Sequence, residues 1–207
     1  MKHLKMIALA AVMASALMAF VGISSASAAT LCSNSGTGVA CASGKAYTGP
    51  IAAELKPGTT VNITGTLPMT CRNSTLSGQV TAGGPGSALN SMTLSGCTML
   101  GATCSFKSVN MPYKMTASGA GGNGNVNVSS GESGNPGYIY TCLGVTCELQ
   151  SGSAGANLAF EGSATGPALK AKSVPLIVTS GSTASCGQTA ILNAEYKVTT
   201  PTSLWIF

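Results

Sequence analysis

The segment Gly131-Glu132-Ser133-Gly134 places a serine in the glycine-flanked setting found around some nucleophilic serines. Such a serine needs an imidazole base and a carboxylate that orients the base. The one histidine, His3, lies in the N-terminal segment. A Ser-Lys dyad stays open in principle, but nothing in the spacing selects a partner among Lys107, Lys114, Lys170, Lys172 and Lys197. The sequence therefore predicts no catalytic residue.

Carboxylates are the other group that could do chemistry, and the chain has no Asp at all. Glycoside hydrolysis needs two carboxyl groups about 5–9.5 Å apart, whereas the glutamates are dispersed along the chain. They are Glu54, Glu132, Glu148, Glu161 and Glu195. Calcium loops commonly depend on Asp, and no Cys/His pattern has zinc spacing. We therefore expect no metal site and no cofactor.

All eight cysteines lie after residue 28, where the N-terminal export signal described below ends. In an exported chain, an even number of cysteines predicts that they pair, here as four disulfides. Neither a C-x-x-C redox motif nor a mixed Cys/His site is present. We predict the pairs Cys32–Cys41 and Cys71–Cys97 and leave the other four cysteines unassigned. Those four are Cys104, Cys142, Cys147 and Cys186.

Apolar and polar residues alternate with period two in ten short segments, which predicts half-buried strands. Gly- and Pro-rich turns separate them, and no stretch sustains a helical period. The predicted strands are residues 61–67, 76–80, 92–96, 104–109, 113–117, 126–128, 138–142, 158–162, 169–178 and 191–198. The pattern predicts an all-β fold: an antiparallel sandwich or barrel of about ten short strands, stapled by disulfides.

The N-terminus has the organisation of a secretory signal. Lys2, His3 and Lys5 precede an apolar run over residues 6–23, and Ala26-Ser27-Ala28 gives an A-x-A cleavage site. We predict a signal peptide over residues 1–28 and one secreted β domain over residues 29–207. The expected location is extracellular, with the periplasm and the cell surface as alternatives.

Charge is scarce, at 7% of all residues, where about 25% is usual. After loss of Lys2 and Lys5, eight basic residues remain against five acidic ones, and they are scattered. This balance is too weak to indicate a nucleic-acid partner. No later segment is long and apolar enough for a transmembrane helix.

The chain ends in the apolar tetrad Leu204, Trp205, Ile206 and Phe207, which contains the one tryptophan. One interpretation is a final strand buried in the core. The other is an exposed edge that meets a second subunit or a hydrophobic surface. The tetrad is therefore the candidate interface.

Residues 71–80 (CRNSTLSGQV), 94–97 (LSGC) and 111–116 (MPYKMT) give an order of elements that resembles small secreted bacterial β-proteins. One group of these is known as activators of alkane oxidation. Residues 196–204 (YKVTTPTSL) are similar to the end of uncharacterised exported proteins from soil bacteria. The resemblance implies an extracellular protein that aids contact with hydrophobic substrates, and it carries over no site residue.

Three functions follow as hypotheses. The first is an exported, non-enzymatic structural or surface-active protein at the cell surface or at a hydrophobic interface, with a hydrophobic surface or ligand as partner. The second is a self-assembling extracellular fibre subunit, whose partner is a copy of itself through strand exchange. The third is a Glu-dependent polysaccharide hydrolase, which needs at least two of the five glutamates.

Overall fold

The computed structural model describes residues 29–34, 41–84 and 86–207. The predicted signal peptide lies outside these residues. The elements are β1 (Leu31–Cys32), β2 (Gly49–Leu55), β3 (Val61–Gly65), β4 (Met69–Val80), β5 (Ala88–Met99), β6 (Ala102–Val109), β7 (Tyr113–Ala120), β8 (Asn123–Ser129), β9 (Gly137–Cys142), β10 (Val145–Ser151), β11 (Ala156–Glu161), β12 (Ala168–Val178), the 3₁₀ helix η1 (Ala184–Cys186), β13 (Thr189–Thr200) and β14 (Trp205–Ile206). The all-β prediction is confirmed.

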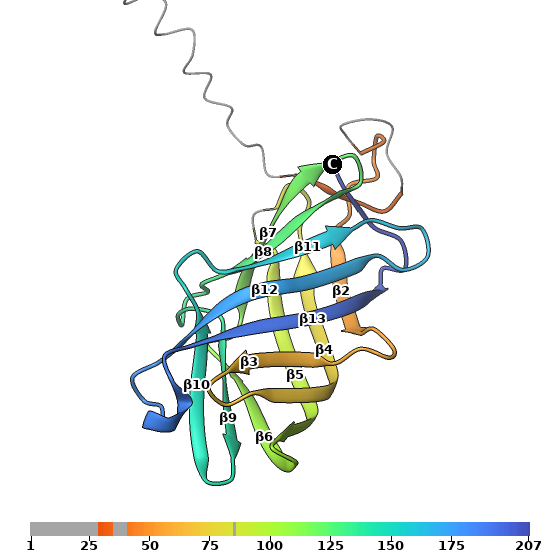
Figure 1. The fold of residues 1–207 in the computed structure, drawn as a ribbon. Helices are drawn as coiled ribbons and strands as arrows, with labels where there is room; N and C mark the ends of the chain where they lie inside the picture. The colour runs from red at the N-terminus through yellow and green to blue at the C-terminus, as the bar shows by residue number, and fades with distance from the viewer. Residues whose placement is uncertain (1–28, 35–40, 85) are drawn as a thin grey trace, which may run out of the picture.

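Twelve of the strands form one closed antiparallel barrel (Figure 1). Four pairs of consecutive strands share the same two neighbours and so act as single, broken strands: β2/β3, β6/β7, β8/β9 and β10/β11. With β4, β5, β12 and β13 they make eight barrel strands in chain order. The ring closes where β13 pairs with both β2 and β3. Of the two architectures that the sequence allows, the barrel is therefore the one observed.

Proline and glycine explain where the broken strands are interrupted. Pro57, Pro112 and Pro136 lie in three of the four breaks, and proline has no N–H to continue a ladder. The fourth break, residues 152–155, contains two glycines, of which Gly155 has a φ of 78°. After each interruption the chain continues as a second strand between the same two neighbouring strands of the barrel.

Two tyrosine hydroxyls join the barrel wall at these breaks. Tyr113 Oη bonds the carbonyl oxygen of Val109 and accepts the N–H of Gly137 at 3.2 Å, so it links the break of β6/β7 to that of β8/β9. Where β2/β3 is interrupted, Tyr196 of β13 meets Ser74 of β4, with 3.0 Å between their oxygens. Since the Ser74 hydroxyl donates to the carbonyl of Thr93 at 2.9 Å, Tyr196 is the donor in this pair.

All eight cysteines pair, and the predicted Cys32–Cys41 and Cys71–Cys97 disulfides are confirmed. The other two are Cys104–Cys142 and Cys147–Cys186, the second of which ties η1 to β10. The strand registers place Cys71, Cys97, Cys104 and Cys142 in one row across β4, β5, β6 and β9. These four buried cysteines fill part of the interior as well as linking neighbouring strands.

Removing the Cys104–Cys142 disulfide by the double substitution C104A/C142A is expected to lower the free energy of unfolding by roughly 2–4 kcal/mol, because the link closes a long loop. Cys32–Cys41 spans only 9 residues against 38. The matched variant C32A/C41A should therefore lose about 1 kcal/mol less. Urea denaturation of the oxidised proteins measures both losses, and a larger loss for C32A/C41A would contradict the argument.

The interior also holds the hydroxyl of Tyr138, which has no hydrogen-bond partner among the described residues. Burial raises the pKa of Tyr138 well above 10, with the neighbouring Tyr140 and Tyr196 adding to the effect. Its hydroxyl is buried and unpaired, whereas that of Tyr196 is paired with Ser74. A buried unpaired hydroxyl costs free energy that a paired one does not.

Tyr138→Phe is therefore expected to leave the free energy of unfolding unchanged or to raise it by about 1 kcal/mol, and Tyr196→Phe to lower it by about 1 kcal/mol. Burial raises both folded pKa values, so this part of the stability is complete below the ordinary phenol pKa of about 10 and falls as the pH rises above it. Urea titrations between pH 8 and about 11 should show a shallower decline for Tyr138→Phe. Equal curves for Tyr138→Phe and the parent protein would contradict this account.

Candidate functional site

An apolar cavity opens inside the barrel at the end where the first described residues, Ala29 and Thr30, meet the C-terminal Phe207. The volume in it that is open to the centre of a water-sized molecule is about 50 Å³. Residues of seven barrel segments line it, together with the start of the described chain. The lining residues are Ala29, Leu31, Ile51, Ala52, Ala53, Leu76, Val80, Thr81, Gly84, Ser87, Leu89, Met115, Thr116, Ala117, Val126, Val128, Leu158, Phe160 and Leu169.

The cavity exists because small side chains point inward at this end. The interior of an eight-stranded barrel is just wide enough to be filled by side chains or to hold one small ligand. Ala53, Ala117 and Val128 are buried here and leave space. At the other end, Tyr138 and Tyr140 are buried and fill the same cross-section. The barrel is therefore packed at one end and hollow at the other.

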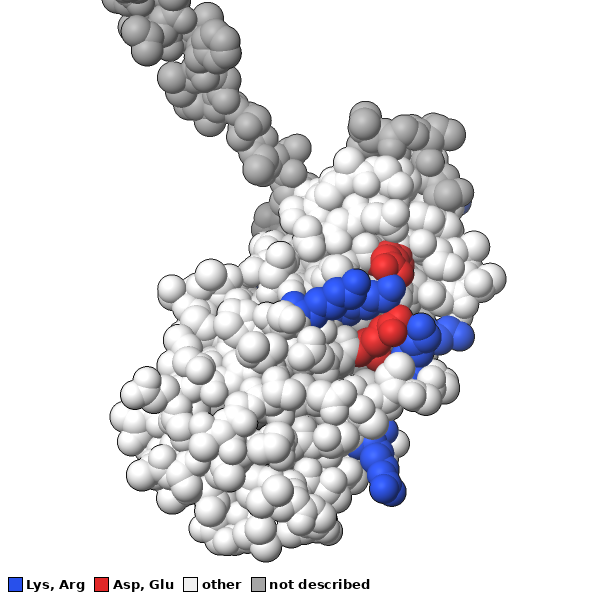
Figure 2. All heavy atoms as spheres, viewed as in Figure 1, with Lys and Arg blue, Asp and Glu red and all other residues white. Residues whose placement is uncertain are grey.

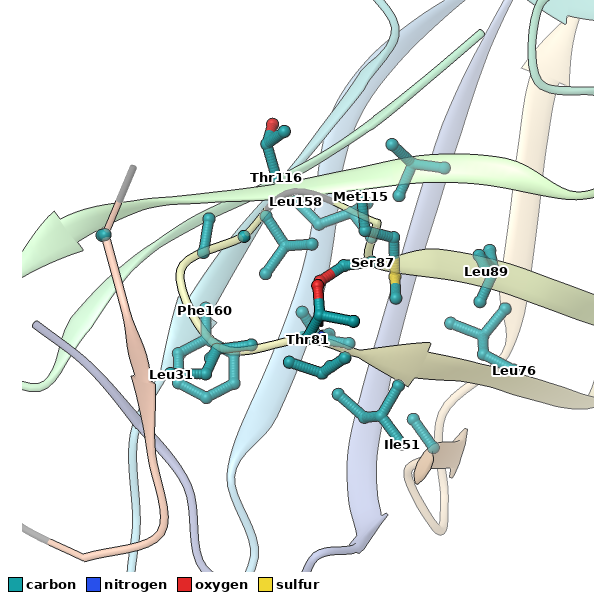
Figure 3. A pocket seen from close by; sticks show the side chains of 18 of the residues that line it. Leu31, Ile51, Leu76, Thr81, Ser87, Leu89, Met115, Thr116, Leu158 and Phe160 are labelled. Carbon is teal, nitrogen blue, oxygen red and sulfur yellow. Dashed lines mark hydrogen bonds between the residues drawn. The ribbon is translucent and has the colours of Figure 1, made fainter. Parts of the chain in front are cut away.

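The adjacent hydroxyl groups of Ser87 and Thr81 make one part of the cavity wall polar. Ser87 is 7% exposed, and its Oγ accepts the N–H of Thr81 at 3.0 Å. The two side-chain oxygens lie 3.5 Å apart, and Figure 3 shows them together between Phe160 and Leu89. No charged side chain is among the lining residues. The cavity thus suits an apolar molecule that carries at most a neutral polar group.

The terminal strands cover this end of the barrel. β1 pairs with β14, with Leu31 opposite Ile206, and Ala29 N–H donates to the carbonyl of Ala117 at 3.1 Å. The backbone of Phe207 exchanges two hydrogen bonds with that of Thr30, at 2.6 and 3.0 Å. The two ends of the described chain are therefore joined by backbone hydrogen bonds beside the cavity. We call this pairing of residues 29–32 with residues 205–207 and Ala117 the terminal clasp.

This clasp decides where the predicted interface residues lie. Leu204 and Ile206 are fully buried, at 0% exposure, while Trp205 and Phe207 are half-buried. The indole of Trp205 lies against Gly162 and Gly122, where a Cβ would approach it to 2.6 and 3.0 Å. Only Trp205 and Phe207 retain surface for an outside partner, and the tetrad as a whole does not form an exposed anchor.

The glutamates lie on the outside of the barrel, away from the cavity. Of the thirteen charged residues after position 28, seven gather on β2, β11, β12, β13 and the residue after β2, and Figure 2 shows charges of both signs gathered on this face. They are Glu54, Lys56, Glu161, Lys170, Lys172, Glu195 and Lys197. Lys170 Nζ lies 2.5 Å from Glu161 and 3.8 Å from Glu195, and Lys56 lies 2.8 Å from Glu195. Lys56, Glu195, Lys170 and Glu161 thus form an ion-pair network.

The electrostatics of this network do not favour acid catalysis. The hydrogen bond from Lys56 holds the pKa of Glu195 below its usual value, and the hydrogen bond to Glu161 raises the pKa of Lys170. A general acid needs a carboxyl group whose pKa is raised. Ser133 and Glu132 of the serine motif are exposed in the break between β8 and β9.

The cavity is the feature that sequence reasoning missed. Its lining residues come from β2, β4, β5, β7, β8, β11 and β12, and they share no motif. The one available signal is that inward positions at one end of several strands are Ala or Val. That signal can be read only once the registers are known.

Comparisons with protein-family models, with curated proteins and with solved structures found no match for this chain. In the part of the chain that the structure describes, no three Cys, Glu or His side chains gather in a way that could hold a metal ion. Among the same residues, no helix has the length and hydropathy needed to cross a bilayer.

Proposed function

We propose that this protein is an exported, non-enzymatic β-barrel that holds one small apolar molecule and so acts where hydrophobic compounds meet water. The observation that carries the proposal is the hollow, apolar end of the barrel, lined by Ala, Val, Leu and Phe, with one hydroxyl pair. Ligand pockets are typically concave and apolar with a few placed polar groups, and the mouths of β-barrels are a common position. The four disulfides fit an extracellular setting.

The chemistry of the lining defines the class of ligand. A carboxylate or an ammonium group would lose its hydration without gaining an opposite charge, because no lining residue is charged. An aliphatic chain that ends in a hydroxyl group matches both the apolar wall and the pair Ser87 and Thr81. We therefore expect neutral, medium-chain alcohols and related hydrocarbons to bind.

The other two hypotheses receive less support. Every barrel strand has a neighbour on both sides within the described residues, so strand exchange would first have to open the ring. The hydrolase hypothesis needs a carboxyl pair in a cleft, whereas Glu161 and Glu195 are ion-paired on the outer face.

A series of 1-alkanols from hexanol to dodecanol should compete with a fluorescent naphthylamine probe for the cavity. Each added methylene group is worth about 0.8 kcal/mol when buried, so the affinity should rise about fourfold per carbon until the cavity is full. Ala117→Leu, which fills the cavity from β7, should weaken binding at least about tenfold. Ala120→Leu adds the same atoms at an exposed position on the same strand and should leave the affinity unchanged. Absence of alkanol binding, or equal affinities for the two variants, would overturn the proposal.

Ser87→Ala removes a hydroxyl from the polar part of the cavity wall and keeps the apolar part. We expect 1-octanol to bind about fivefold more weakly, which corresponds to the loss of one hydrogen bond of about 1 kcal/mol. The affinity for the apolar naphthylamine probe should not change. Probe displacement measures both values, and an equal loss for the alcohol and the probe would mean that Ser87 has a structural role only.

A further inference from the structure

The end of the barrel opposite the cavity carries the two most exposed large apolar side chains of the described residues. Leu100 is 79% exposed and Leu143 is 66% exposed. Leu100-Gly101 joins β5 to β6, and Leu143-Gly144 joins β9 to β10. Both are two-residue turns, because Met99 pairs with Ala102 and Cys142 with Val145. The same dipeptide therefore forms both tips.

Leucine is an unfavourable residue for these turns. Leu100 has a φ of 51° and Leu143 a φ of 53°, a left-handed conformation that Asn, Asp and Gly adopt far more readily at this position of a hairpin turn. Each leucine therefore holds the backbone in a conformation that costs free energy. It also exposes an apolar side chain to water. The fold of the hairpins accounts for neither property.

The two tips are held side by side. β6 pairs with β9, and Cys104–Cys142 joins these strands directly beside the tips, with 4.5 Å between the Cα atoms. Figure 1 shows the hairpins of β5 and β6 and of β9 and β10 projecting from the same end of the barrel. A disulfide-linked pair of tips loses little conformational freedom on contact with a surface.

The connections at this end of the barrel carry no charge. Four connections form it, residues 66–68, 100–101, 143–144 and 179–188, and none of them contains a charged residue. In Figure 2, one basic side chain projects at the lower right of the molecule, beside this end. The ion-pair network lies on the side of the barrel.

We propose that Leu100 and Leu143 insert into the surface of a lipid bilayer with neutral, zwitterionic headgroups, so that the protein docks by this end. The connections carry no basic residue that would attract an anionic surface. The tips are convex: a Cβ added at Gly101 or Gly144 would meet no atom within 4 Å. Two separate protruding side chains suit a fluid apolar medium, whereas a protein partner would need a matching groove for each.

The experiment uses the purified, oxidised protein and dioleoylphosphatidylcholine vesicles in a flotation assay at millimolar lipid. We expect the protein to float with the vesicles, equally at low and high salt and without gain from added phosphatidylserine. L100N/L143N should weaken vesicle binding at least about tenfold for each leucine replaced. Because Asn suits the left-handed turn position, this variant should also unfold at the same or a higher urea concentration, which separates lost binding from misfolding.

The matched control removes two exposed isoleucines from the wall of the barrel. Ile177 is 51% exposed and Ile191 is 42% exposed, and I177T/I191T should float like the parent protein. No flotation of the parent protein, equal flotation of L100N/L143N, or an equal loss in I177T/I191T would overturn the proposal. Alkanol binding is expected to be intact in L100N/L143N, and vesicle binding intact in Ala117→Leu, so failure of the docking proposal and failure of the cavity proposal are distinguishable.

Discussion

The hydrogen bonds between β13 and the broken strand β2/β3 are the interaction on which the rest of this structure depends, because they turn an open meander into a ring. An open sheet of this length would leave two long edges with unpaired backbone groups. Closure satisfies those groups and at the same time fixes which residues face inward. The cavity, the row of cysteines and the pair of tips are all consequences of the registers that the closed ring imposes.

A ring built from small side chains gains little from its core, and the cysteines offset this weakness. The inward positions near the cavity are mostly Ala, Val and Leu, so dispersion and hydrophobic contacts are fewer there than in an aromatic core. Covalent links placed at the other end stabilise the ring without filling the hollow part. Cys71–Cys97 and Cys104–Cys142 lie in one row at that end, which allows the cavity to remain open.

The strands were largely predictable because one face of each is buried and the other is exposed to solvent, which makes apolar and polar residues alternate along the sequence. Ten segments carried the alternating pattern, and each matches a strand of the barrel. β2 and β10 were missed. In β2, Ala52 and Ala53 on opposite faces blur the alternation, and in β10 the half-buried Val145 and Thr146 do the same at its start. The predicted segment 61–67 ends at Gly65, because residues 66–68 turn into β4.

The candidate site was not predictable, and the reason is geometric. A cavity is the absence of side-chain volume at one height of the barrel, so it depends on which alanines and valines of seven segments come level with one another. Cys32–Cys41 and Cys71–Cys97 could be predicted from short separations and neighbouring strands. The burial of Leu204 and Ile206 depended on β1, a strand of only two residues, which no periodicity can reveal.

The positions of the cavity and the tips at opposite ends constrain how the two proposals combine. A closed, disulfide-linked barrel cannot bend its two ends toward each other, so a protein docked through Leu100 and Leu143 points the mouth of its cavity away from the lipid. A ligand would then enter from the aqueous side, or from a partner there, instead of passing directly out of the bilayer beneath. The terminal clasp around Ala29 and Phe207 stands beside that mouth. Half-buried Trp205 and Phe207 are consequently placed where such a partner would make contact, at the end that faces water.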